Sequence, residues 1–101
     1  MALETRLDTA SETLTISISG RFDFGIHQDF RNATEQASSG VSVIVVDMGR
    51  VDYLDSSALG MLLVLRDKVG ESKSAIRIKS AKPDVRKILE IANFDKLFTL
   101  E

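Results

Sequence analysis

Residues Asp52 to Gly60 read Asp-Tyr-Leu-Asp-Ser-Ser-Ala-Leu-Gly, and this short segment is the most informative in the chain. It places a carboxylate and two adjacent hydroxyls directly before the apolar run Met61-Leu62-Leu63-Val64-Leu65. This order predicts a helix start, because side-chain oxygens accept hydrogen bonds from the unpaired amides of a first helical turn. Most clusters of this kind are plain helix caps. This one follows a strand-like run, a setting in which the amide donors and the positive helix end favour a phosphoryl group.

Apolar spacing along the rest of the chain predicts alternating strands and helices. Strands are indicated where apolar residues alternate with polar ones or run together, and helices where they recur every three to four positions. The predicted strands cover Leu3–Leu7, Thr13–Ser19, Val41–Met48 and Ala75–Lys79, with a short edge segment or turn at Leu97–Leu100, and the predicted helices run from about Ile26 to Ala37, from Ser56 or Ser57 to about Val69, and onward from Pro83.

Glycines and β-branched residues refine these predictions. We expect Gly20 to end the second strand, and Gly40 and Gly70 to stop the first two helices. The unbroken run Val43–Val46 indicates a strand that is buried on both faces. Because helices then connect mostly parallel strands, this order predicts an α/β fold in one domain that spans residues 1–101.

Composition excludes several classes of function. The chain has 101 residues, 44% of them hydrophobic and 28% charged, with a net charge of −2. This suits one small globular core and provides no basic face for nucleic acid. The chain has no cysteine, which excludes disulfides and fits a reducing compartment. The first residues of the chain are charged, so we do not expect them to form a signal peptide. The apolar runs are far shorter than the ~20 residues that span a bilayer. We therefore expect a cytoplasmic protein that binds neither nucleic acid nor membrane.

The second predicted helix is apolar on too many faces. One side carries enough leucine to pack on a sheet, yet Ala58, Met61, Val64 and Leu65 fall substantially on other sides. Either neighbouring helices cover these residues, or an exposed patch around Met61 and Leu65 marks a surface for a partner. Both alternatives remain open at this point.

The two adjacent serines have different roles depending on which residue caps the helix. If Asp55 is the cap, Ser56 takes the first helical position and points outward, while Ser57 turns toward the amides or the sheet. If Ser56 is the cap, its hydroxyl is partly occupied and Ser57 is freer. Local chemistry does not choose between these arrangements.

These residues resemble the STAS domain, and within it the bacterial anti-sigma factor antagonists. The hallmark of that family is a buried strand, a short polar turn and Asp-Ser-Ser/Thr-Gly-Leu-Gly at a helix start, which stands here as Asp55-Ser56-Ser57-Ala58-Leu59-Gly60. A second element, Gly-x-apolar-Asp, stands as Gly20-Arg21-Phe22-Asp23. The resemblance covers essentially the whole chain. It implies a STAS fold, in which a small, mixed, mostly parallel sheet is packed with about four helices.

The resemblance also implies a switch at Ser56. A partner serine kinase would phosphorylate Ser56 and a serine phosphatase would restore it, while the unphosphorylated protein would bind an anti-sigma factor and release the sigma factor. Asp23 would lie close to Ser56, and Asp55 and Ser57 would support it. The partner would bind at Ala58, Leu59, Gly60, Met61 and Leu65.

Two details of the resemblance concern the partner. Ala58 stands where the family usually has glycine, and its methyl group narrows what can approach the helix start. The stretches around Asp23 and Ser56 look most like those of HsbA-type antagonists. In that subgroup the switch is operated by a response regulator with both kinase and phosphatase activity.

Two other functions compete with this interpretation, a hydrolase and a STAS module that is not phosphorylated. A hydrolase would need His27 within hydrogen-bond reach of Ser56, with a carboxylate behind the ring. The chain has no nucleophile-elbow or phosphate-binding glycine motif, and a single histidine without cysteine cannot anchor a zinc site, so we expect neither an enzyme nor a bound metal or cofactor. The remaining alternative is a STAS module that is not phosphorylated and instead senses a ligand or scaffolds a larger complex.

Overall fold

A computed structural model describes residues 2–35, 41–69 and 75–101. Its strands form one sheet in the order β1-β2-β3-β4-β5. They are β1 (Leu3–Asp8), β2 (Thr13–Phe22), β3 (Val43–Leu54), β4 (Ile76–Lys79) and β5 (Thr99–Leu100). β1 pairs antiparallel with β2, and every later pair is parallel. The sheet is therefore mixed and mostly parallel, as predicted.

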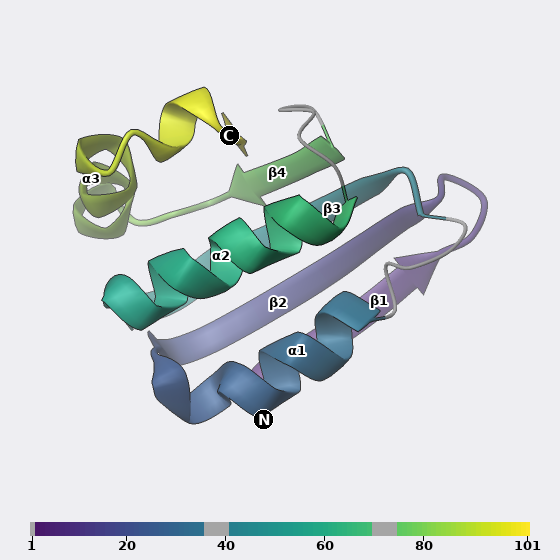
Figure 1. The fold of residues 1–101 in the computed structure, drawn as a ribbon, viewed down its shortest axis with the longest axis horizontal. Coiled ribbons are helices and arrows are strands. Elements are labelled where there is room, and N and C mark those ends of the chain that lie inside the picture. The colour runs from purple at the N-terminus through teal and green to yellow at the C-terminus, as the bar shows by residue number, and fades with distance from the viewer. Residues whose placement is uncertain (1, 36–40, 70–74) are drawn as a thin grey trace.

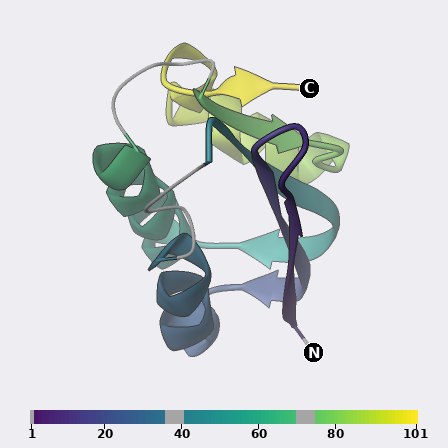
Figure 2. The same cartoon turned by 90° about the vertical axis from the view of Figure 1, so that its right-hand side faces the viewer.

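The described residues contain three α-helices, which are α1 (His27–Glu35), α2 (Ser56–Val69) and α3 (Pro83–Ile91). α1 and α2 lie side by side across one face of the sheet, in front of β2 and β3 in Figure 1 and on the same side of the strands in Figure 2. α3 lies apart from this pair and packs against β3. The family resemblance predicted about four helices, one more α-helix than the described residues contain; these residues also include the short 3-10 helices η1 (Phe24–Ile26) and η4 (Phe94–Lys96).

Along the central strands of the sheet, every second side chain points into the core. Alternate side chains of the three central strands are buried, namely Leu14, Ile16, Ile18, Ile44, Val46, Met48, Ile76 and Ile78. They belong to one cluster with Phe30 of α1 and Leu62 of α2, and each such burial contributes about 1.5–3 kcal/mol. The prediction that Val43–Val46 is buried on both faces is wrong. Val43 and Val45 are only half-buried, because they point away from the face that α1 and α2 cover.

β2 and β3 both continue further than predicted. β2 passes through Gly20 to Phe22, because Gly20 adopts a φ of +76° where the pairing with β3 is irregular. The prediction that Gly20 ends the strand is therefore wrong. β3 continues beyond Met48 to Leu54, so strand takes the place of the expected polar turn and only Asp55 separates it from α2.

The helix predictions are largely confirmed. α2 covers Ser56–Val69, and α3 begins at Pro83, whose missing N–H costs nothing in a first turn. α1 begins at His27, directly after η1. The predicted stops at Gly40 and Gly70 lie outside the described residues.

Candidate functional site

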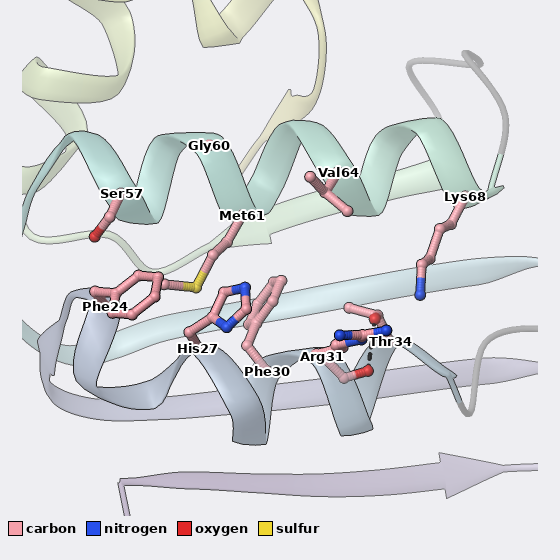
Figure 3. A pocket seen from close by; sticks show the side chains of 10 residues that line it. All are labelled: Phe24, His27, Phe30, Arg31, Thr34, Ser57, Gly60, Met61, Val64 and Lys68. Carbon is pink, nitrogen blue, oxygen red and sulfur yellow. Dashed lines mark hydrogen bonds between the residues drawn. The ribbon is translucent and has the colours of Figure 1, made fainter.

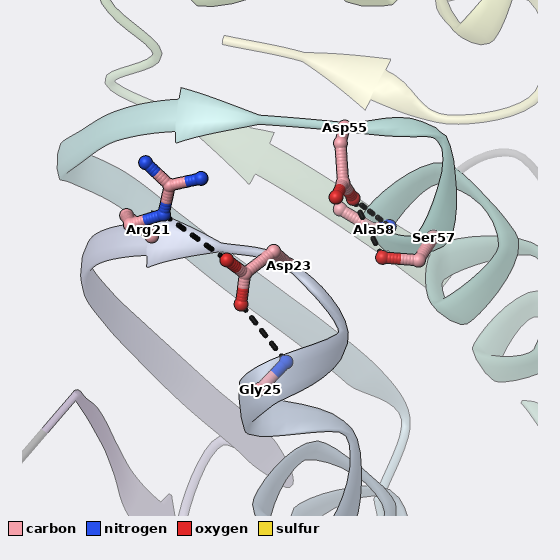
Figure 4. A network of polar contacts seen from close by, with 6 residues as sticks. All are labelled: Arg21, Asp23, Gly25, Asp55, Ser57 and Ala58. Atoms are coloured by element: carbon pink, nitrogen blue, oxygen red, sulfur yellow. Dashed lines mark hydrogen bonds and ion pairs between the residues drawn. The ribbon is translucent and has the colours of Figure 1, made fainter.

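Two turns meet where β2 and β3 end. Phe22 and Leu54 are the last residues of these strands and are partners in the sheet register. Asp23 and Asp55 follow them directly, so both carboxylates lie at the carboxyl edge of the parallel strands (Figure 4). Ligand and partner sites of α/β folds commonly lie at this edge.

Asp55 is the cap of α2. Its Oδ1 accepts a 2.6 Å hydrogen bond from the Ser57 hydroxyl and a 3.1 Å hydrogen bond from the N–H of Ala58 (Figure 4). The bond from Ser57 lowers the pKa of Asp55 below its ordinary value of 3.8, against the opposing effect of burial. The N–H groups of Ala58 and Ser57 and the charge of Arg21 lower that pKa further. Asp55 is therefore an anion at neutral pH.

Ser56 occupies the first position of α2 and is exposed. Among the described residues, none forms a hydrogen bond with its hydroxyl. Of the two capping arrangements left open by the sequence, the structure has the first: Asp55 caps the helix, Ser57 is bound to Asp55, and the Ser56 hydroxyl faces solvent.

Asp23 caps the turn that leads into α1. Its Oδ1 accepts a 2.9 Å hydrogen bond from the N–H of Gly25, and its Oδ2 forms a 3.1 Å ion pair with Nε of Arg21 (Figure 4). The Arg21 guanidinium also lies 4.1 Å from the centre of the Tyr53 ring, a cation–π contact. Within the described part of the chain, no hydrogen bond joins Asp23 to Ser56, so the supporting role of Asp23 stays a prediction.

Arg21 had no role in the sequence-based prediction of the site. It is the register partner of Tyr53 in the sheet, and its charge contributes to lowering the pKa of Asp55. The available signal was its position two residues before Asp23, but the contact with Tyr53 depends on strand pairing that the sequence pattern does not reveal.

α2 buries most of the residues that were expected to bind a partner. Ala58 and Leu65 expose 0% of their surface and Met61 exposes 6%. The alternative of an exposed patch around Met61 and Leu65 is wrong, because α1 packs alongside α2 and these side chains join the core. Leu59 is half-buried and Gly60 is exposed.

Other apolar side chains are exposed on α2 and near its start. Phe24 exposes 67% of its surface and Tyr53 42%, while Val64 and Leu63 in the middle of α2 expose 55% and 39%. Exposed apolar side chains that form a contiguous patch are typical of surfaces that contact partners or ligands.

A groove of about 580 Å³ runs between α1 and α2. Figure 3 shows Ser57 and Phe24 at one end of this groove and Lys68 with Arg31 at the other. The groove therefore begins beside the capped start of α2.

His27 lies in this groove but does not form a catalytic triad in the described structure. Its ring stacks on Phe24, with ring centres 4.8 Å apart and planes inclined by 15°. No hydrogen bond between described residues joins His27 to Ser56 or Ser57, since the Ser57 hydroxyl donates to Asp55.

Charged residues near the end of β3 and in or just before α3 form ion pairs with each other. Asp52 forms an ion pair with Lys82, the residue before α3, and Arg86 pairs with Glu90 at 3.4 Å. Exposed pairs of this kind contribute about 0–1 kcal/mol. Within these pairs, the charges of Asp52 and Arg86 are partly neutralised.

The described residues include no group of three or more histidine, aspartate or glutamate side chains placed to hold a metal ion. Nor does any helix within residues 2–35, 41–69 and 75–101 have the length and apolar character required to cross a membrane.

The sequence profile of the family described as "Mlab, STAS domain" matches residues 5–100. The chain belongs to the STAS domain family. A STAS-domain containing protein of Pseudomonas aeruginosa (strain UCBPP-PA14) is 49% identical over 100 residues, which is 99% of each chain. A putative anti-sigma factor antagonist of Bordetella bronchiseptica, BtrV, is 30% identical over 63 residues, which is 62% of this chain and 54% of that protein.

Solved structures of anti-sigma factor antagonists share the STAS fold. SpoIIAA in its unphosphorylated form superposes with a TM-score of 0.71 at 20% identity, covering 94% of this chain and 96% of that one. An antagonist from Mycobacterium paratuberculosis superposes with a TM-score of 0.79 at 21% identity, covering 97% of this chain and 84% of that one. The predicted family and fold class are thereby confirmed, whereas likeness to the HsbA-type subgroup stays a prediction.

Proposed function

We propose that this STAS domain is an anti-sigma factor antagonist that phosphorylation of Ser56 switches off. The observation that supports this most directly is the difference between neighbouring side chains at the start of α2. Asp55 and Ser57 are bound to each other, while the hydroxyl of Ser56 is exposed and has no hydrogen-bond partner among the described residues. A kinase can therefore reach this oxygen without disturbing the cap.

A phosphate on Ser56 is compatible with the fold. It would add about −1.5 to −2 charges at the N-terminus of a 14-residue helix. The partial positive charge there favours an anion by about 0.3–1 kcal/mol. Because the cap is formed by Asp55, the modification removes no hydrogen bond of the described structure.

The same phosphate would oppose docking of a partner at this edge. Its water would have to be removed beside the Asp55 carboxylate, which is negatively charged at neutral pH. Arg21 supplies only partial compensation, since it already pairs with Asp23. Each ~1.4 kcal/mol of such a penalty weakens binding about tenfold.

The partner surface proposed here differs from the one expected from sequence. Gly60, Leu63 and Val64 are exposed on α2 and would contact the partner directly. Met61 and Leu65 are buried beneath them and would position the helix. Burial of a Leu or Val side chain in the complex would contribute up to about 1.5–3 kcal/mol.

The similar proteins support this assignment. BtrV carries the name of a putative anti-sigma factor antagonist, and SpoIIAA has been solved in both unphosphorylated and phosphorylated forms. By this likeness, the partners would be an anti-sigma factor or partner-switching serine kinase and a serine phosphatase, all in the cytoplasm. The domain itself would act by binding rather than by catalysis.

A capture experiment tests the proposal. Unmodified protein, protein with phosphoserine at position 56, and protein with phosphoserine at Ser11 are immobilised and exposed to an extract of the source bacterium. Ser11 is exposed in the β1–β2 turn, at the opposite end of β2 from the site, so it carries the same charge to a remote place. Mass spectrometry then identifies the retained proteins.

We expect an anti-sigma factor or serine kinase to be retained by the unmodified protein and by the Ser11-modified protein. Phosphoserine at position 56 should reduce its retention about tenfold or more. Equal retention by all three proteins would contradict the switch, as would failure of any such regulator to bind the unmodified form.

A further inference from the structure

The groove between α1 and α2 has two chemically different ends. At the start of α2 its walls are apolar and aromatic, with Phe24 67% exposed, Val64 55% exposed and Met61 between the helices (Figure 3). At the other end, Arg31 from α1 and Lys68 from α2 point toward the same place above Thr34 (Figure 3). The groove is therefore amphipathic along its length.

The size of the groove suits a small molecule. Its volume of about 580 Å³ lies within the usual range of ~300–1,000 Å³ for ligand sites. Ser57 and Lys68, which line its two ends, are separated by about three turns of α2, or about 16 Å. An elongated ligand fits this shape better than a compact one.

The two cations are available to an anionic group. Lys68 has no ion-pair partner among the described residues, and Arg31 makes only a 3.9 Å contact with Glu35 while 62% of its side chain stays exposed. A lysine in the last turn of a helix is favourable for the helix itself. Arg31 comes from the other helix and points to the same end of the groove, which that helix effect does not explain.

The opposite end of the groove would repel an anion. Ser57 there donates a 2.6 Å hydrogen bond to the Asp55 carboxylate, which is negatively charged at neutral pH. A ligand with one anionic head would therefore have a preferred direction, with its head between Arg31 and Lys68 and its apolar body toward Phe24 and Met61.

We propose that the α1–α2 groove binds a single-chain anionic amphiphile, such as a medium-chain carboxylate. The carboxylate pairs with Arg31 and Lys68, and the chain lies along Met61 and Val64. The groove shares Gly60 and Val64 with the proposed partner surface, but the ligand it would bind goes beyond the proposed switch and is tested on the unmodified protein without a partner.

Gly60 provides a steric test of the site. It lines the groove, and a Cβ added at this position meets no atom within 4 Å. Gly60→Ala therefore adds a methyl group in open space, whereas Gly60→Leu would extend a branched side chain from the same point toward the apolar half of the groove. Comparing the two variants distinguishes the effect of blocking the groove, which only leucine should do, from the effect of replacing a glycine within a helix, which both do.

The experiment titrates dodecanoate, below its micelle concentration, into the isotopically labelled full chain and follows backbone amides by NMR. Dodecan-1-ol, which has the same chain and no charge, is titrated in parallel. We expect saturable shifts confined to the amides of α1 and α2, and binding of dodecanol about tenfold or more weaker. Lys68→Glu and Gly60→Leu should each weaken dodecanoate binding about tenfold, whereas Gly60→Ala and Lys87→Glu should not.

Lys87 is exposed on α3, away from the groove, and so controls for net charge. Amide dispersion matching that of the wild type shows that each variant is folded. Three results would overturn the proposal: no saturable shifts, equal affinity for the alcohol and the carboxylate, or affinity unchanged by both Lys68→Glu and Gly60→Leu. A dimer of the ligand-free protein that Gly60→Leu dissociates would also overturn it, because the groove would then hold a second copy of the chain.

Discussion

The hydroxyl of Ser57 donates a 2.6 Å hydrogen bond to Oδ1 of Asp55, the same oxygen that accepts the N–H of Ala58 at the start of α2. The hydrogen bonds of this one carboxylate oxygen therefore give the two adjacent serines different environments. Ser57 is bound to the cap, while Ser56 at the first helical position presents its hydroxyl to solvent.

Removing the titrating group at position 55 should flatten the acid dependence of stability. The pKa of Asp55 in the fold is below the 3.8 of the unfolded chain, so its stabilising effect is complete above 3.8 and is lost as pH falls through the lower folded value. Asp55→Asn keeps a capping side chain but cannot titrate. Urea unfolding between about pH 5 and pH 2 should show a steeper loss in the wild type than in Asp55→Asn. Parallel curves would mean that Asp55 does not titrate differently in the folded state.

The two serines should differ in their effect on stability. Ser57→Ala removes the hydrogen bond to Asp55 and should lower the free energy of unfolding by about 1 kcal/mol. Ser56→Ala removes an exposed hydroxyl and should change it by no more than about 0.5 kcal/mol. Urea denaturation of both variants checks this, and the reverse order would show that Ser56 is the structural residue.

Two neighbouring apolar positions on α2 should also respond differently. Leu65 is completely buried, so Leu65→Ala should cost about 2–5 kcal/mol through lost burial and a cavity. Val64 is 55% exposed, and Val64→Ala should leave the free energy of unfolding within about 0.5 kcal/mol of the wild type. Denaturant unfolding of the pair tests the packing of α2, and a stable Leu65→Ala protein would contradict it.

Gly60→Ala should stabilise the fold. Gly60 is exposed within α2, and an added Cβ meets no atom within 4 Å. Alanine is favoured over glycine in a helix interior by about 1 kcal/mol. The free energy of unfolding should rise by about that amount in a urea titration. A lower value would show that the space beside Gly60 is filled in solution.

The order of strands and helices was predictable because hydrophobic periodicity is a local property. Leu14, Ile16 and Ile18 of β2 alternate with polar residues, and the Asp55-Ser56-Ser57 cluster marks the start of α2 correctly. The extension of β3 to Leu54 was not predictable in this way. Gly49 and Asp52 are residue types that are common in turns, and the pairing of Val51, Tyr53 and Leu54 with β2 keeps this segment in the strand.

The geometry of the candidate site was only partly predictable, because it also depends on contacts between segments that are far apart in the sequence. Whether Asp55 or Ser56 caps α2 depends on backbone geometry at the strand end, since either side chain can accept a hydrogen bond from the helix amides. Burial of Met61 and Leu65 depends on where α1 packs, which their spacing in α2 does not reveal. Long-range packing therefore decided which atoms are exposed.

The affinity of the captured regulator for the domain shows whether a phosphate on Ser56 controls binding. Isothermal titration should compare unmodified protein with proteins that carry phosphoserine at position 56 or at Ser11, while thermal unfolding confirms that all three are folded. We expect a Kd at least about tenfold higher for phosphoserine at position 56. We also expect an unchanged Kd for phosphoserine at Ser11 and a similar Tm for all three proteins. Equal Kd values for the unmodified and Ser56-phosphorylated domains would contradict the phosphorylation switch.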